Sequence, residues 1–302
     1  MISHRAWSER LVLIAPYAWL AVLFLAPFAI VIKISLSQSA LALPPYTPVF
    51  DWRAGPDAWI AGVREFSFAA YASLAEDALY LDSYLSSLRL AATATVLTLL
   101  VAYPMAYAMA RAPARWRPVL VTLAIAPFWT SFLIRVYAWI AILKDEGLLN
   151  HALIALGLIA EPLHVFGTDW AVQIGIVYSY LPFMLLPLYN AIARQDASLV
   201  EAAADLGAGP VAQFWKITFP LSLGGVLAGA LLVFIPAVGE FVIPDLLGGS
   251  DTLMIGHTMW TEFFDNRDWP TASAATVVLL ALLLPPLALY DRSRRRATEQ
   301  PT

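Results

Sequence analysis

The sequence predicts an all-α integral membrane protein with six transmembrane helices. Of its 302 residues, 60% are hydrophobic and 13% are charged, and the mean hydropathy is +0.71. Soluble domains carry about 25% charged residues, so this composition belongs to the membrane class. Six apolar segments are also long enough to cross a hydrocarbon core about 30 Å thick, which takes a helix of about 20 residues.

The six predicted spans follow one another without a low-complexity linker. They comprise residues 11–36, 85–110, 119–143, 171–192, 221–243 and 271–290. A cleaved signal peptide is the alternative for the first span, because Ala40-Leu41-Ala42 resembles a small-residue cleavage site. The apolar stretch before it is well beyond the about 7 to 15 residues usual in such a signal, so we expect a retained helix. In the fifth span, Gly225 and Gly229 form a small-xxx-small pair that predicts close helix packing.

Arginine and lysine near the span ends predict the orientation, because these residues stay preferentially in the cytoplasm. One set of ends carries Arg5, Arg10, Arg111, Arg115, Arg117, Arg194, Lys216, Arg292, Arg294, Arg295 and Arg296. The opposite ends carry fewer. We therefore expect residues 1–10 to be a cytoplasmic N-terminus, 11–290 to be the six-span membrane domain and 291–302 to be a cytoplasmic tail. The connection 196–220 is then cytoplasmic as well.

The outward connections are acidic. Their carboxylates are Asp51, Asp57, Glu65, Glu76, Asp77, Asp82, Asp145, Glu146, Glu161, Asp169, Asp245, Asp251, Glu262, Asp265 and Asp268. Such a face would concentrate cations and disfavour sulfate, molybdate or phosphate, although acidic residues also simply keep external loops soluble. The longest outward connection, residues 37–84, contains four prolines together with Trp52 and Trp59. Its length predicts a small folded cap.

Residue types exclude several enzyme and metal classes. The chain has no cysteine, and His4, His151, His164 and His257 do not approach the spacing of metal ligands, so we expect no metal site. The lysines of the chain, Lys33, Lys144 and Lys216, never follow glycine, which excludes the Gly-Lys pair of a P-loop. We therefore expect a chain that hydrolyses no nucleotide itself, lies in membrane lipid and binds no nucleic acid.

The cytoplasmic connection predicts two short helices joined at an angle. Ser198 and Glu201 fit a capping box that would start the first helix. Gly207 and Gly209 then allow positive φ and a sharp turn, and Pro210 suits the first turn of the second helix.

The second of these helices carries Val211, Phe214 and Trp215 on one face. We expect this apolar face to be exposed to the cytoplasm, where it fits a partner protein. The alternative is a loop that packs against the cytoplasmic end of the bundle itself, with Glu201 serving only as a helix cap.

The same connection closely resembles the signature loop of ABC importer permeases. The matching positions are Glu201, Ala202, Ala203, Gly207, Ile217 and Pro220, whereas Phe219 stands where leucine is more usual. The resemblance implies that these residues couple the chain to a separate ATP-binding-cassette ATPase, which receives the two helices in a cleft. ATP and Mg²⁺ would then be bound by that ATPase, and this chain would bind no cofactor.

Two charged residues in or near apolar runs are candidates for a substrate pathway. Glu240 falls at the end of the fifth span, where Pro236 and Gly239 should loosen the helix and expose carbonyl groups that could line a path. The alternative for Glu240 is an interfacial carboxylate that reaches water. Arg135 lies inside the third span, where a charge usually faces a cavity or a partner, and a salt bridge to Glu240 is one alternative.

Aromatic residues near Arg135 extend this candidate pathway. Trp129, Tyr137 and Trp139 could make cation–π contacts with an ammonium group, although aromatic belts at membrane interfaces are commoner. The expected pathway residues are Glu240, Asp245, Trp129, Tyr137 and Arg135.

Three longer stretches resemble the bacterial polyamine permeases, and most of all the putrescine-transport member. They are PFWTSFLIRVYAW, VGEFVIPDLLGGSDTLMIG and FFDNRDWPTASA, and the resemblance runs from about the second span to the sixth. It implies a type I importer fold in the bacterial inner membrane. The implied partners are a second permease subunit, an ATPase dimer and a periplasmic substrate-binding protein.

The expected function is import of putrescine or a related polyamine by alternating access, and a cationic substrate agrees with the acidic outer face. Within the same class, iron or an amino-acid derivative is the alternative substrate. An ion-coupled secondary carrier is the alternative from a different class, and it would leave the cytoplasmic signature unexplained.

Overall fold

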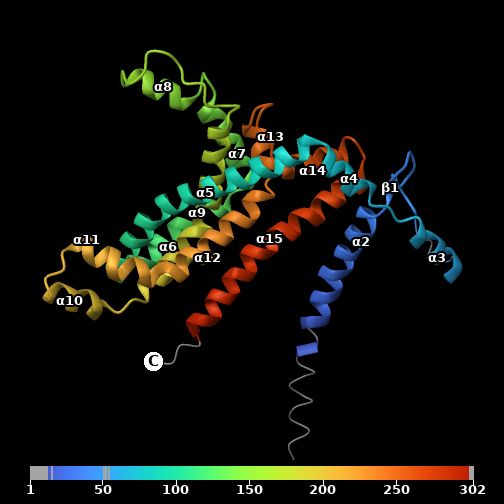
Figure 1. Ribbon diagram of the computed structural model, residues 1–302. Coiled ribbons are helices and arrows are strands. Elements are labelled where there is room, and N and C mark those ends of the chain that lie inside the picture. The colour runs from blue at the N-terminus through green and yellow to red at the C-terminus, as the bar shows by residue number, and fades with distance from the viewer. Residues whose placement is uncertain (1–12, 15, 50–52, 54, 299–302) are drawn as a thin grey trace, which may run out of the picture. The chain divides into compact units, whose positions relative to one another are not determined.

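The computed structural model describes residues 13–14, 16–49, 53 and 55–298, and these residues are mostly helical (Figure 1). The helices are η1 (Ala21–Leu25), α2 (Ala26–Ser35), α3 (Pro56–Arg64), α4 (Ala69–Glu76), α5 (Ala78–Arg111), α6 (Arg117–Ile125), η2 (Ala126–Trp129), α7 (Phe132–Leu143), α8 (Leu148–Ala155), α9 (Asp169–Ala193), α10 (Ala197–Asp205), α11 (Pro210–Gln213), η3 (Phe214–Thr218), α12 (Phe219–Val238), α13 (Val242–Leu247), α14 (Ile255–Phe264) and α15 (Trp269–Thr298). The strands are β1 (Gln38–Ser39) and β2 (Tyr46–Thr47). The chain divides into two compact units, Met1–Leu81 with Thr258–Leu282 and Asp82–His257 with Leu283–Thr302.

The first unit contains the folded cap that the long outward connection predicted. Strand β1 pairs antiparallel with β2, so that Gln38 lies opposite Thr47, and helices α3 and α4 follow. The ammonium group of Lys33 lies 4.1 Å from the centre of the Tyr46 ring, and the Ser39 hydroxyl donates to the Asp268 carboxylate at 2.6 Å. Most of residues 37–84 is therefore ordered secondary structure. Asp51 and Trp52 lie outside the described residues.

The second unit has its core where α5, α9 and α12 meet. Buried side chains from all three helices form one cluster, which includes Ala102, Ala106, Leu188 and Val233. Helices α9 and α12 pack along their lengths.

Two glycines set the distance between these helices. A Cβ atom at Gly225 would lie 2.6 Å from the Cβ of Ala191, and one at Gly229 would lie 2.7 Å from the sulfur of Met184. The small-xxx-small prediction is confirmed, because no larger side chain fits at either position.

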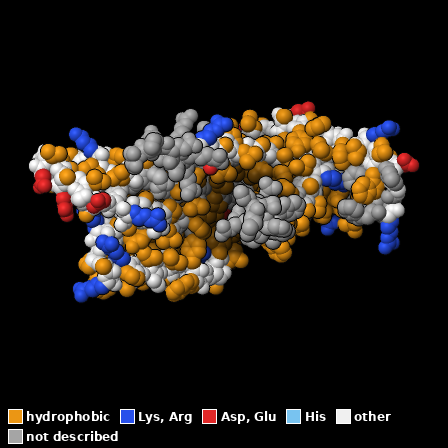
Figure 2. All heavy atoms as spheres, turned by 90° about the horizontal axis from the view of Figure 1, so that it is seen from below, with side chains coloured by type: hydrophobic (Ala, Val, Ile, Leu, Met, Phe, Trp, Pro, Cys, Tyr) orange, Lys and Arg blue, Asp and Glu red, His pale blue; other side chains and the backbone are white. Residues whose placement is uncertain are grey.

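Five helices of the described part of the chain are long and apolar enough to cross a membrane: Pro16–Ser35, Ala78–Arg111, Asp169–Ala193, Pro210–Val238 and Trp269–Arg292. The pair Arg117–Trp129 and Phe132–Ala155 becomes a sixth if it crosses as one bent span. Apolar side chains dominate the face shown in Figure 2.

The third span is not the single helix predicted over 119–143. Its two halves meet at an angle of 88°. Pro127 lacks an N–H and its ring would clash with the carbonyl four residues earlier, so α6 ends at Ile125 and a short 3₁₀ turn follows. Thr130 and Ser131 are extended between the halves.

The fifth span also differs from its predicted range of 221–243. It begins earlier, because α11, η3 and α12 form one continuous helix from Pro210 to Val238. The π-helical turn η3 ends two residues before Pro220, which cannot donate to the carbonyl of Lys216. The helix ends at Val238, so Ile243 belongs to α13 instead.

The remaining spans agree with their predictions except at some ends. Helix α9 matches 171–192 to within two residues, whereas α5 starts seven residues before position 85 and α15 continues to Thr298. The first candidate span starts at Pro16, and the predicted N-terminus 1–10 lies outside the described residues.

Replacing Gly225 by alanine should destabilise the packing of α9 against α12. Gly224→Ala is the matched control, because no heavy atom lies within 4 Å of the Cβ added there. Both changes add about 1 kcal/mol of helix propensity, so their difference isolates the overpacking, which we expect to cost about 1–3 kcal/mol. Thermal unfolding of the purified chain in detergent measures it, and equal midpoints for the two variants would contradict the packing.

Candidate functional site

Helix α10 begins with a cap two residues earlier than the sequence predicted. The Asp196 carboxylate accepts the backbone N–H of Ser198 at 3.0 Å, and this hydrogen bond lowers the pKa of Asp196 below its usual value. The predicted capping box of Ser198 and Glu201 is therefore wrong, because Asp196 already supplies the cap. Glu201 lies in the middle of α10 and is exposed, so its carboxylate is not needed to start the helix.

The turn between α10 and α11 is fixed by one glycine. Gly207 has φ +82°, and its N–H donates to the carbonyl of Ala204 while the N–H of Ala208 donates to the carbonyl of Ala203. This pair of bonds is the Schellman motif, which requires a left-handed residue at the position of Gly207. Gly209 has φ −70° and is extended, so of the two glycines Gly207 is the one that uses the positive φ that glycine allows.

The second helix of the connection 196–220 does not present all three predicted side chains outward. Phe214 is half-buried and meets the rings of Tyr103 and Tyr107 edge-on at 5.5 Å and 6.1 Å between centres. Val211 and Trp215 are 72% and 59% exposed. Phe214 thus packs the connection against α5, whereas Val211 and Trp215 remain exposed.

Residues 197–217 form a hairpin with an apolar exterior, which we call the docking hairpin. Its exposed apolar side chains are Leu199, Leu206, Val211 and Trp215. Of the predicted coupling residues, Glu201, Ala202, Gly207 and Pro220 are exposed, whereas Ala203 and Ile217 are half-buried. The Gln213 amide donates to the carbonyl of Ala208 at 2.7 Å, which closes the turn from inside.

Glu240 is buried at the break between α12 and α13. It is 8% exposed, so it is not an interfacial carboxylate that reaches water. Its Oε2 accepts the Tyr180 hydroxyl at 2.5 Å, and its Oε1 accepts the N–H groups of Val242 and Ile243 at 3.1 Å and 3.4 Å. The side chain therefore satisfies the first amides of α13 and links them to α9.

Arg135 lies on α7 without the salt bridge to Glu240 that was one alternative. Its guanidinium lies over the rings of Phe128 and Phe132, 5.0 Å and 5.7 Å from their centres. Its Nε and Nη1 atoms are buried, and neither has a hydrogen-bond partner in the described part of the chain. Two aromatic faces thus stabilise this charge in place of a carboxylate.

Among the described residues, the hydrogen-bond partners of Glu240 do not include the other predicted pathway residues. Trp129 and Tyr137 are 76% and 58% exposed. Asp245 stands on α13, where its carboxylate lies 3.3 Å from Nε2 of His257. Tyr180, the hydrogen-bond partner of Glu240, was not predicted from the sequence. The sequence indicated it only by a hydroxyl group inside an apolar span.

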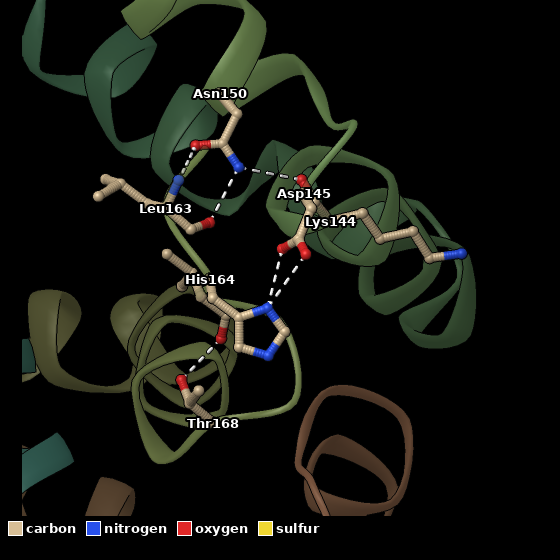
Figure 3. A network of polar contacts seen from close by, with 7 residues as sticks. Lys144, Asp145, Asn150, Leu163, His164 and Thr168 are labelled. Atoms are coloured by element: carbon tan, nitrogen blue, oxygen red, sulfur yellow. Dashed lines mark hydrogen bonds and ion pairs between the residues drawn. The ribbon is translucent and has the colours of Figure 1, made fainter. Parts of the chain in front are cut away.

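A network of polar contacts organises the connection between α7 and α9 (Figure 3). Buried Asn150 on α8 exchanges two hydrogen bonds with the backbone of Leu163, at 2.8 Å and 2.9 Å, and also donates to the carbonyl of Lys144 at 3.3 Å. His164 Nδ1 lies 3.1 Å from both carboxylate oxygens of Asp145. These contacts hold Leu163 and His164 close to α8 and to the residues just before it.

Comparison with known proteins identifies relatives over most of the chain. Residues 99–299 match the family described as binding-protein-dependent transport system inner membrane component. The chain is 41% identical over 217 residues to the spermidine/putrescine transport system permease protein PotB of Haemophilus influenzae, covering 72% of this chain and 76% of that protein. It is 42% identical over 219 residues to PotB of Escherichia coli (strain K12), covering 72% and 80%. The inner membrane ABC transporter permease protein YdcU of the same organism is 31% identical over 225 residues, covering 70% and 71%.

Solved structures show the same fold at low sequence identity. The crystal structure of a bacterial ABC transporter involved in the import of the acidic polysaccharide alginate has a chain that matches with a TM-score of 0.67 and 16% identity, covering 98% of this chain and 97% of that chain. A second structure, of the alginate transporter in complex with an alginate pentasaccharide-bound periplasmic protein, matches with the same TM-score and identity, covering 99% and 97%. The type I importer fold expected from the sequence is confirmed.

Replacing Glu240 by alanine should loosen the start of α13, because two backbone N–H groups and the Tyr180 hydroxyl lose their acceptor. Each buried group left without a partner costs about 1–3 kcal/mol. Glu240→Gln is the matched control, since its amide oxygen can still accept the two backbone N–H groups and its NH2 group can donate to the oxygen of Tyr180. Thermal unfolding and amide hydrogen exchange over residues 242–247 measure the effect. If alanine and glutamine variants exchanged at equal rates, Glu240 would not be the cap.

Proposed function

The chain belongs to the family of binding-protein-dependent transport system inner membrane components, and we propose that it carries putrescine or a related polyamine through the membrane for an ATP-driven importer. It is a transport subunit, and two of its relatives, the PotB proteins of Haemophilus influenzae and Escherichia coli, are permease proteins of spermidine/putrescine transport systems. ATP and Mg²⁺ would bind to a separate ATPase. The observation that carries the proposal is the docking hairpin with its exposed apolar side chains.

The docking hairpin has the properties of a protein-binding surface. Leu206 and Val211 are 89% and 72% exposed, and Trp215 adds an aromatic side chain of the kind that dominates interface energies. Exposed Glu201 lies on the same hairpin. Its partner would be an ATP-binding-cassette ATPase dimer, whose cleft receives α10 and the first turns of the following helix.

The hairpin is mechanically continuous with the fifth span. The helix Pro210–Val238 contains 29 residues, so it carries a displacement over about 44 Å at about 1.5 Å per residue. When ATP binding closes the ATPase dimer, movement of the hairpin would shift this helix and reorient the spans. This is alternating access driven from the cytoplasmic side.

The substrate path would use the side chains that remain available around the two broken spans. Exposed Trp129 and Tyr137 offer faces for an ammonium group, and exposed Asp245 offers a carboxylate. Glu240 would position the break in the fifth span rather than hold the cation, because its acceptors are already engaged by Tyr180 and α13. The positive charge of Arg135 would repel the cationic substrate, so the path would bind it only weakly.

The assembly would lie in the bacterial inner membrane, with both termini and the docking hairpin in the cytoplasm. A second permease subunit would complete the path, and a periplasmic binding protein would deliver the substrate to the acidic outer face. A substrate such as iron or an amino-acid derivative is the alternative within this class.

Replacing Glu201 and Gly207 together by alanine should uncouple ATP hydrolysis from uptake. Alanine at φ +82° strains the turn without a clash, since nothing lies within 4 Å of the added Cβ. We expect uptake to fall about tenfold, the effect of about 1.4 kcal/mol of lost interface energy, while the amount of protein in the membrane stays unchanged.

The matched control for the glycine change is Gly157→Ala. Gly157 has φ +69° with nothing within 4 Å of its Cβ, so the same backbone strain is introduced outside the hairpin. Unchanged uptake in the hairpin variant, or an equal loss in the control, would rule out the docking role.

Uptake of labelled putrescine by membrane vesicles that contain the complete importer should be inhibited by unlabelled putrescine and by spermidine. Chelated iron and amino acids should compete little, because they lack two separated ammonium groups. Vanadate should stop uptake, since an ABC ATPase drives it. Competition by iron or amino acids alone would refute the polyamine assignment, and vanadate-insensitive uptake by the lone chain would indicate a secondary carrier.

A further inference from the structure

A groove of about 510 Å³ lies between the first half of α5 and the start of α9. Arg89, Val96 and Leu97 line it from α5, and Asp169, Trp170 and Gln173 line it from α9. Its volume falls within the range of about 300–1,000 Å³ that is usual for small-molecule sites. None of these residues has a part in the docking hairpin or around Glu240.

The mouth of the groove carries two opposite charges that do not neutralise each other. In the part of the chain that the structure describes, neither Arg89 nor Asp169 forms an ion pair. Asp169 accepts one hydrogen bond, from the neutral hydroxyl of Thr252 at 2.9 Å. A ligand with both a negative and a positive group therefore finds a partner for each.

Gln173 adds an unused acceptor next to this mouth. The side chain is 5% exposed, and its amide nitrogen donates to the carbonyl of Leu90 at 3.1 Å and to the Thr93 hydroxyl. Its Oε1 atom is buried without a hydrogen-bond partner among the described residues. A buried acceptor left unpaired is unfavourable, so a donor in the ligand would stabilise this site.

The charged and apolar residues of the groove lie at the depths of the head group and the acyl chains of a lipid. Arg89 lies about 33 Å along α5 from Arg111, and Asp169 lies about 38 Å along α9 from Arg194, at about 1.5 Å per residue. Both are therefore at head-group level in the leaflet opposite Arg111 and Arg194, since the hydrocarbon core is about 30 Å thick. Val96 lies about 10 Å deeper, at acyl-chain level.

We propose that the groove binds one phospholipid with a primary ammonium head group, phosphatidylethanolamine. Its phosphate pairs with Arg89, its ammonium group donates to Asp169 and to Oε1 of Gln173, and one acyl chain follows Val96 and Leu97. Trp170, which is 68% exposed, flanks the head group, where aromatic rings gather at membrane interfaces. The head group is chosen by hydrogen bonding, because a choline group offers no N–H donor.

The transported cation is a poor occupant of the same groove. A polyamine carries positive charge only, so Arg89 would repel it, and the apolar residues deeper in the groove would desolvate it. The head group of the lipid would pair with both charges, and its acyl chain would cover the apolar residues of the groove.

Native mass spectrometry of the full-length chain, alone and with the subunits that purify with it, tests this site. The protein is released from nanodiscs of equal parts phosphatidylethanolamine, phosphatidylcholine and phosphatidylglycerol. We expect one retained phosphatidylethanolamine per chain, preferred over the other two lipids about two- to tenfold, as one or two hydrogen bonds provide. Asp169→Asn should abolish the preference over phosphatidylcholine, and Arg89→Gln should reduce retention of all three lipids.

Asp251→Asn and Arg64→Gln are the controls, because they remove exposed charges outside the groove and should leave retention unchanged. Thr252 can still donate to an asparagine at position 169, so the first variant keeps the local fold. Equal retention of the three lipids, or equal behaviour of Asp169→Asn and Asp251→Asn, would overturn the proposal. Retention by the lone chain that disappears in the assembled complex would overturn it as well, since the groove would then hold a helix of a partner.

Discussion

The carboxyl group of Glu240 satisfies the backbone amides that are freed where α12 ends and α13 begins. Glu240 and Ile243 are buried, so water does not reach these groups and the break persists only where the protein supplies partners for its backbone. Tyr180 holds the second carboxyl oxygen from α9, and it reaches Glu240 because Gly225 and Gly229 let α9 and α12 approach closely. The break between α12 and α13 thus depends on the close packing of α9 against α12, because that packing brings Tyr180 to Glu240.

The same helix joins this break to the docking hairpin. Because Pro210–Val238 is continuous, the hairpin and Glu240 lie at opposite ends of one stiff element. Phe214, packed against Tyr103 and Tyr107, binds the lower part of that element to α5. On the proposed mechanism, a force on the hairpin would therefore move α5 and α12 together and would reach the break as a displacement.

The sequence predicted the features that depend on local pattern. Apolar length gave the spans, Gly207 gave the turn, and Gly225 with Gly229 gave the helix contact. It failed where neighbours compete or where the partner is distant. Asp196 displaced the predicted cap because two residue types with similar capping strength stand in one turn.

Distant partners explain the other misses. Phe214 turned inward because Tyr103 and Tyr107, far away in sequence, offered a packed site. Glu240 was found as an isolated charge, but its Tyr180 partner depends on the packing of two helices, which no local pattern contains. The sequence therefore predicted the two short helices and the turn of the connection 196–220, but it did not predict the side-chain contacts that hold them.

Arg135 sets a limit on how strongly a cation can bind along the proposed path. Its own charge already occupies the faces of Phe128 and Phe132, so these rings cannot serve a travelling ammonium group. Exposed Trp129 and Tyr137 remain, and both stand within a few residues of that fixed positive charge. Each cation–π contact contributes about 0.5–1 kcal/mol at an exposed site, and repulsion from Arg135 acts against it. On the proposed function, such a path would hold a polyamine weakly at every point, which suits passage, and tight binding would be left to a separate periplasmic protein.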